Sequence, residues 1–95
     1  MAVGDVVSNI VSVASGAFLD IQPSAGKEWV IHNISHADQA ELYFFDGTNN
    51  LLVDIDPGQG SWTGFFFHCT NSRYYRVKNI IGSAQLIGFD GVETK

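Results

Sequence analysis

Short apolar runs alternate with turn-forming residues along the whole chain. The turn signals are clusters of Gly, Pro, Asn, Asp and Ser, such as Asp56-Pro57-Gly58. The intervals between them are too short for helices but suit strands, and β-branched and aromatic residues are frequent in them. The runs that predict strands are residues 6–13, 17–22, 29–35, 40–45, 51–55, 62–69, 74–80 and 84–89.

This spacing predicts an all-β fold, a single antiparallel β-sandwich of jelly-roll type with seven to eight strands. The chain has 95 residues, enough for one hydrophobic core, so residues 1–95 are predicted to form one domain. Residues 1–15 are mostly small or β-branched. They are interpreted either as an edge strand or as an arm that adds a strand to a neighbouring subunit.

Two of the predicted strands, residues 40–45 and 62–69, are apolar on both faces. A strand in a two-layer sandwich needs only one apolar face, so the second face is predicted to contact another protein. The alternative is that these residues belong to strand ends covered by loops. The candidate interface with another subunit or protein consists of Val7, Val11, Val13, Tyr43, Phe45, Phe65 and Phe67.

The run 51–55 alternates regularly. Leu51, Val53 and Ile55 share one face, and Asp54 and Asp56 share the other. Carboxylate oxygens are the ligands that calcium prefers, but the EF-hand spacing is absent. The acidic residues are therefore interpreted as polar strand and turn residues, and no metal site is predicted.

The composition is poor in charge and rich in aromatic residues. Charged residues make up 16% of the chain, where about 25% is usual, and aromatic residues make up 13%. The net charge is −5, and the few basic residues do not form the basic face that nucleic-acid binding requires. No signal peptide or membrane-spanning run is recognised, so we expect neither a nucleic-acid nor a membrane partner.

No constellation of residues points to catalysis. Cys69 is the single cysteine, which excludes an internal disulfide, and its apolar surroundings predict a buried thiol. The adjacent His68 would point to the opposite face of the strand and so could not act as its base. His32 and His36 would lie about 13 Å apart on a strand, too far to share a metal ion. We therefore predict no enzyme activity, no catalytic residue and no cofactor.

Two stretches resemble small β-sandwich structural proteins of tailed bacteriophages. One runs from Ala17 to Ile34 and contains Ile21-Gln-Pro-Ser-Ala-Gly-Lys-Glu-Trp29; the other runs from Tyr74 to Lys95 and begins Tyr-Tyr-Arg-Val-Lys-Asn. The resemblance covers most of the chain from Ala17 onward. Its motifs are strand and turn signatures rather than functional residues, so it transfers no catalytic residue.

The resemblance implies a capsid decoration or cement protein. Such a protein is a non-enzymatic virion component that lies on the capsid surface as a homotrimer and stabilises the head by bridging subunits of the major capsid protein. The alternative is a small carbohydrate- or receptor-binding module at the tail or head surface. In that case Trp29 and Trp62 are the candidate residues for stacking on a glycan.

Overall fold

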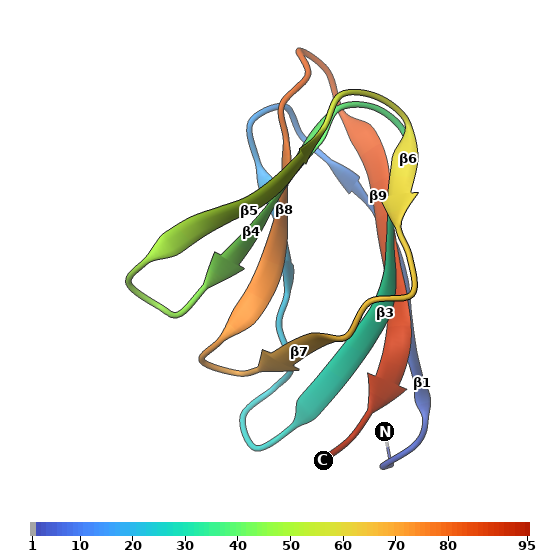
Figure 1. The fold of residues 1–95 in the computed structure, drawn as a ribbon, viewed down its shortest axis with the longest axis vertical. Helices are drawn as coiled ribbons and strands as arrows, with labels where there is room; N and C mark the ends of the chain where they lie inside the picture. Colours follow the sequence, from blue (N-terminus) through green and yellow to red (C-terminus); the bar gives the residue numbers. More distant parts are fainter. Residues whose placement is uncertain (1) are drawn as a thin grey trace.

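The computed structural model describes residues 2–95, and this part of the chain forms two antiparallel β-sheets that face each other, without helices (Figure 1). Sheet A contains, in order, β1 (Val6–Val13), β9 (Gln85–Glu93), β3 (Glu28–His36) and β6 (Gly60–Trp62), and β7 (Phe67–Thr70) also pairs with β3. Sheet B contains, in order, β2 (Phe18–Ile21), β8 (Tyr74–Asn79), β4 (Ala40–Phe45) and β5 (Asn50–Asp56). The predicted antiparallel β-sandwich is confirmed.

The strand count differs from the expected seven to eight, because the run 62–69 forms two strands, β6 and β7, which pair with different parts of β3. Between them the chain turns at Gly64, whose φ of 72° is a conformation that favours glycine. The Gly64 N–H donates to the Asn33 side chain (3.3 Å), which attaches this turn to β3.

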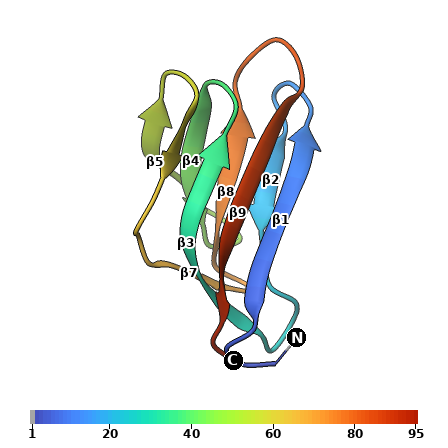
Figure 2. The same cartoon turned by 90° about the vertical axis from the view of Figure 1, so that its right-hand side faces the viewer.

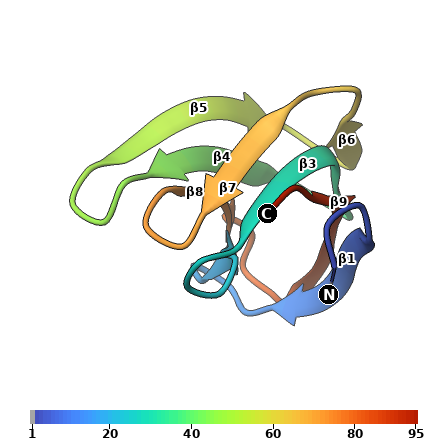
Figure 3. The ribbon, with the colours of Figure 1, turned by 90° about the horizontal axis from the view of Figure 1, so that it is seen from below.

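Most connections cross from one sheet to the other. Only the β4–β5 hairpin and the β6–β7 loop stay within one sheet. The predicted jelly-roll connectivity is compatible with this pattern. Figure 2 shows β1 at one edge of sheet A beside β9, and Figures 1 and 3 show that the β4–β5 hairpin projects away from the rest of the molecule.

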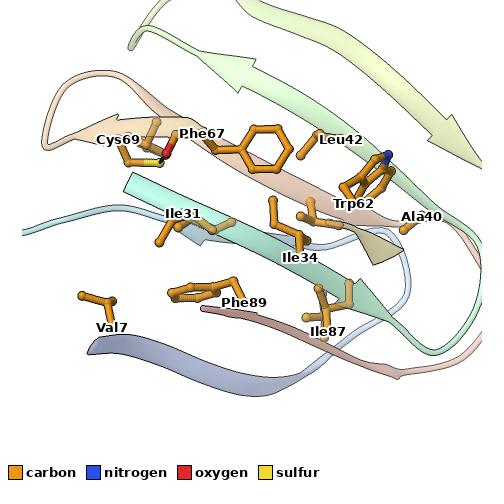
Figure 4. Close-up of a cluster of buried hydrophobic side chains, with 14 residues drawn as sticks. Val7, Ile31, Ile34, Ala40, Leu42, Trp62, Phe67, Cys69, Ile87 and Phe89 are labelled. Atoms are coloured by element: carbon orange, nitrogen blue, oxygen red, sulfur yellow. Dashed lines mark hydrogen bonds between the residues drawn. The ribbon is translucent and has the colours of Figure 1, made fainter. Parts of the chain in front are cut away.

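The core lies between the sheets and is built mainly from aliphatic side chains (Figure 4). Alternation places them there: in β9 the odd-numbered residues face sheet B, and Ile87 and Phe89 are both buried. The side chains that are almost fully excluded from solvent include Ile21, Ile31, Ile34, Leu42, Val77 and Ile87.

Residues Val6–Val13 form an edge strand rather than an arm, because they pair with β9 along their whole length. This pairing turns Val7 and Val13 into the core, where they are buried, and packs Val11 against it. Phe67 lies in β7, which pairs with β3, and its side chain is also buried in the core. The prediction that Val7, Val13 and Phe67 form an interface is therefore wrong, since their side chains are already covered by their own chain.

Candidate interaction surfaces

The edge strand β5 exposes a continuous row of apolar side chains. It is the last strand of sheet B, so in residues 2–95 no further strand pairs with its outer edge. Exposed fractions in this row range from 43% at Leu52 to 63% at Leu51. Soluble proteins normally protect such an edge with charges or a covering segment. We call the exposed apolar side chains the β5 patch: Leu51, Leu52, Val53 and Ile55.

The orientation of β5 follows from the polar groups beneath it. The indole N–H of the buried Trp62 donates to Asp54 (2.8 Å), and Asp56 lies 2.9 Å from the ring of the buried His36. A buried indole N–H without an acceptor would cost about 1–3 kcal/mol. The acidic side of β5 therefore faces sheet A, and the side that carries Val53 and Ile55 faces solvent.

His36 lies close to Asp56 without forming a well-aligned hydrogen bond. Its Nε2 lies 2.9 Å from the carboxylate of Asp56, but the N–H direction does not meet the oxygen. The other ring nitrogen, Nδ1, lies 2.7 Å from the Asp38 carbonyl oxygen, and the ring packs on Trp62 with centroids 4.9 Å apart. Together these contacts attach the end of β5 to β3 and β6.

Leu51 is exposed although it lies on the inner face of the hairpin. It pairs with Phe44, which contacts Tyr75 (centroids 4.9 Å apart), and Tyr75 in turn contacts Phe67 (4.8 Å). The aromatic row continues from Phe67 to Phe65 (5.3 Å). Sheet A does not reach Leu51, so the sandwich is open beyond this aromatic row.

The β6–β7 loop adds two exposed aromatic side chains. Phe65 is 50% exposed and Phe66 is 69% exposed. The ring of His32 lies edge-on to Phe66 (5.4 Å between centroids), and its Nδ1 is 3.1 Å from the Phe65 carbonyl oxygen. The strands β5 and β6 are the last strands of their sheets, and residues 57–59 join them. The β6–β7 loop and the β5 patch therefore lie on the same side of the sandwich (Figure 3).

The outer face of sheet B carries an ordered cluster around Arg76. Its guanidinium lies over the rings of Phe18 (4.2 Å) and Phe45 (4.4 Å) and is paired with Asp20 (2.9 Å). Tyr43 packs edge-on against Phe18 (5.5 Å). The predicted interface residues Tyr43 and Phe45 thus lie together, half-buried, on this face, and Arg76 already has its anionic partner.

The two tryptophans do not form a glycan-stacking platform. Trp62 is only 6% exposed and belongs to the core. Trp29 is half-buried, stacks on Phe89 (6.2 Å between centroids) and donates to Glu93 (3.4 Å). The prediction of Trp62 as a stacking residue is wrong, because a core position with a bonded N–H leaves no ring face for a sugar.

The groups weighed for chemistry do not assemble into a reactive centre. Burial raises the pKa of the Cys69 thiol to about 11, so it stays protonated at neutral pH, and His68 points to the exposed side of β7. Across residues 2–95, no three His, Cys, Asp or Glu residues are grouped so that they could hold a metal ion. The same part of the chain contains no helix that is long and apolar enough to cross a membrane.

The Asp46 carboxylate holds the β4–β5 turn, which leads to a pH prediction. It accepts hydrogen bonds from the backbone N–H groups of Asn49 (2.6 Å) and Thr48 (2.9 Å), and these bonds lower its pKa from 3.8 to about 2. A lowered pKa in the folded state means that the bonds stabilise the turn above the unfolded value near 4 and are lost as the pH falls through 2. An NMR titration should show the Asp46 carboxyl and both amide protons changing together near pH 2. A midpoint near 3.8 would contradict this assignment.

Comparison with known proteins does not place the chain in a family. No protein-family model matches it, and no curated protein matches its sequence.

Proposed function

We propose that this protein is a non-enzymatic structural component of a tailed-bacteriophage virion, a capsid decoration or cement protein that bridges subunits of the major capsid protein. The observation that carries the proposal is the β5 patch, with the exposed Phe65 and Phe66 on the same side of the sandwich. Exposed apolar surface of this kind marks contact with another macromolecule. The sequence resemblance of residues 17–34 and 74–95 supplies the phage context.

The shape of this surface favours a protein partner over a small molecule. Small-molecule sites are concave, with a few polar groups that orient the ligand. The β5 patch is instead an apolar strand edge, and the carboxylates of Asp54 and Asp56 face inward, engaged by Trp62 and His36. Covering this edge with a partner would remove apolar area from water at about 25 cal/mol per Å² and so stabilise both proteins.

The proposed location is the outer surface of the capsid, after synthesis in the host cytoplasm. A small protein present in many copies can hold a shell together even if each contact is weak, because neighbouring contacts raise the effective concentration. Self-association strengthens this effect, and the resemblance implies a homotrimer. The other proposed partner is the major capsid protein.

A binding experiment with charged variants tests the function. The double variant Val53→Lys/Ile55→Lys places two ammonium groups on the β5 patch, where both side chains are exposed and the fold is not disturbed. Heads assembled from the major capsid protein of the same genome should bind the wild-type chain in sedimentation and resist a higher temperature. The double variant should bind at least tenfold more weakly, a change of about 1.4 kcal/mol.

Leu86→Lys is the matched control, because Leu86 is an equally exposed apolar residue on the outer face of sheet A. It should bind heads as the wild type does. A wild-type chain that does not bind heads would refute the function. Normal binding by the double variant would refute the assignment of the β5 patch.

A further inference from the structure

The edge strand β1 of sheet A lacks the features that protect β5. All eight residues of β1 pair with β9 without a register shift, and its sequence contains no charged residue, proline or glycine. In β5, by contrast, Leu42 pairs with Asp54 and Tyr43 with Leu52, so Val53 is an extra, bulged residue. Bulges, charges and prolines are the usual means of preventing edge-to-edge pairing. A regular, uncharged edge is therefore a template for another strand.

The hydrogen-bonding groups of β1 that point away from the sheet can be identified from its ladder. The Glu93 N–H donates to the Asp5 carbonyl (3.0 Å), so Asp5 faces β9. Because the pattern alternates in an antiparallel pair, the odd-numbered residues of β1 bond to β9 and the even-numbered ones point outward. The Ile10 N–H also points outward, where it is bonded to the neighbouring Asn9 side chain (2.9 Å), a local bond that a pairing strand would replace.

The same even-numbered residues place neutral side chains on the outer face of sheet A. Val6 is 70% exposed and Ile10 is 73% exposed, and Ser8 and Ser12 alternate with them. The odd-numbered Val7 and Val13 fill the core instead. The edge thus combines outward-pointing backbone groups with a row of exposed apolar and hydroxyl side chains.

We propose that β1 pairs antiparallel with β1 of a second copy of this chain about a two-fold axis, which joins the two sheets A into one continuous sheet. In the register that bonds the outward-pointing groups, Ile10 lies opposite Ile10 of the partner subunit and Ser8 lies opposite Ser12 of the partner subunit. The inference goes beyond the proposed function and stands on the geometry of β1 alone. It replaces the three-fold arrangement that the resemblance implies.

The neutral, self-complementary sequence of β1 favours a second copy as the occupant. Each chain carries a net charge of −5, so two copies repel each other wherever acidic side chains would meet. The residues of β1, Val6–Val13, include no ionisable side chain, and self-pairing sets neutral residues against neutral residues along the whole strand. A partner of opposite charge would instead be drawn to the acidic parts of the surface.

Analytical ultracentrifugation of the full chain tests the pairing. The wild type should sediment as a dimer of about 21 kDa, twice the 10.4 kDa of one chain. Ile10→Lys puts a charge opposite its own copy, and Ser8→Pro removes an outward N–H that β9 does not use. Both variants should shift to 10.4 kDa while their far-UV circular dichroism stays that of the folded wild type.

A control separates this interface from the capsid contact. Val53→Lys/Ile55→Lys introduces two charges on sheet B, away from β1, and should remain a dimer. A monomeric or trimeric wild type, or a dimer that persists in folded Ile10→Lys and Ser8→Pro, overturns the β1 pairing. Failure of a β1-paired dimer to bind heads would refute the proposed function and leave the pairing intact.

Discussion

Replacing Gly91 by Ala is expected to lower the free energy of unfolding by about 3–5 kcal/mol, one of the largest effects available in this chain. Gly91 lies in β9 and is packed against β3. A methyl group at this position would clash with the Val30 carbonyl oxygen and lie 2.6 Å from the Ile31 Cα. These are backbone atoms of a paired strand, so they cannot move aside as a flexible side chain could.

The clash falls where β3 and β9 are already irregular. Their register shifts between Ile31 and Asn33, and the close approach of the two backbones at Gly91 accompanies this shift. Accommodating a methyl group would separate the two central strands of sheet A, together with the core residues Ile31 and Phe89 that they carry.

Urea unfolding followed by circular dichroism measures the effect as a lower midpoint with an unchanged slope. Gly82→Ala is the control, because a methyl group at Gly82 meets no atom within 4 Å and the φ of Gly82 is not positive. The free energy of unfolding of this variant should stay within about 0.5 kcal/mol of the wild-type value. A Gly91→Ala protein as stable as this control would show that β3 and β9 can separate freely at this point.

The sequence predicts where the strands of this protein lie better than it predicts which face of each strand is buried. The runs 6–13 and 40–45 match β1 and β4 at both ends, because turn residues bound them closely. In the last strand, alternation correctly places Ile87 and Phe89 on one face. Gly91 is the reason that this strand continues to Glu93, since only glycine permits the close approach to β3.

Alternation identifies which residues share a face but not which face is buried. In β5 the bulge at Val53 places Leu51 on the inner face, so the predicted face shared by Leu51 and Ile55 is interrupted. The alternation of Ile55 with Asp54 is correct, yet the apolar side chain points outward. The reason is non-local: Trp62, eight positions further along the chain, needs an acceptor within the core. The inward orientation of the acidic side of β5 could have been predicted from Trp62. A tryptophan placed in the core needs an acceptor for its N–H, and the nearest preceding carboxylates in the sequence are Asp54 and Asp56.

Phe67 shows the same limit of alternation. Phe65 and Phe67 lie on the same face of an ideal strand, but the turn at Gly64 breaks the strand between β6 and β7, so Phe67 enters the core and Phe65 stays half exposed. In β1 the valine-rich face fills the core, and the sparser face with Val6 and Ile10 is exposed to solvent.

Asn79 closes one end of the sandwich through a fully bonded side chain. It is the last residue of β8 and is completely buried. Its amide nitrogen donates to the carbonyl oxygens of Val13 (2.9 Å) and Ser83 (2.8 Å). Its amide oxygen accepts from the Ile81 N–H (3.1 Å) and from the Gln85 side chain (2.8 Å). One side chain therefore joins β8 to the end of β1, to the β8–β9 loop and to β9.

Asn79→Asp is expected to reduce the free energy of unfolding by about 3–5 kcal/mol at neutral pH, because it keeps the shape of the side chain but replaces two donors by a buried carboxylate oxygen that faces two carbonyls. Protonation restores one donor and removes the charge, so the loss should be smaller at acidic pH. Urea unfolding at the two pH values measures this, with Asn50→Asp, the same change at an exposed residue of β5, as the control. A loss equal to that of the control, or independent of pH, would mean that the carboxylate reaches solvent and that Asn79 does not hold the end of the sandwich closed.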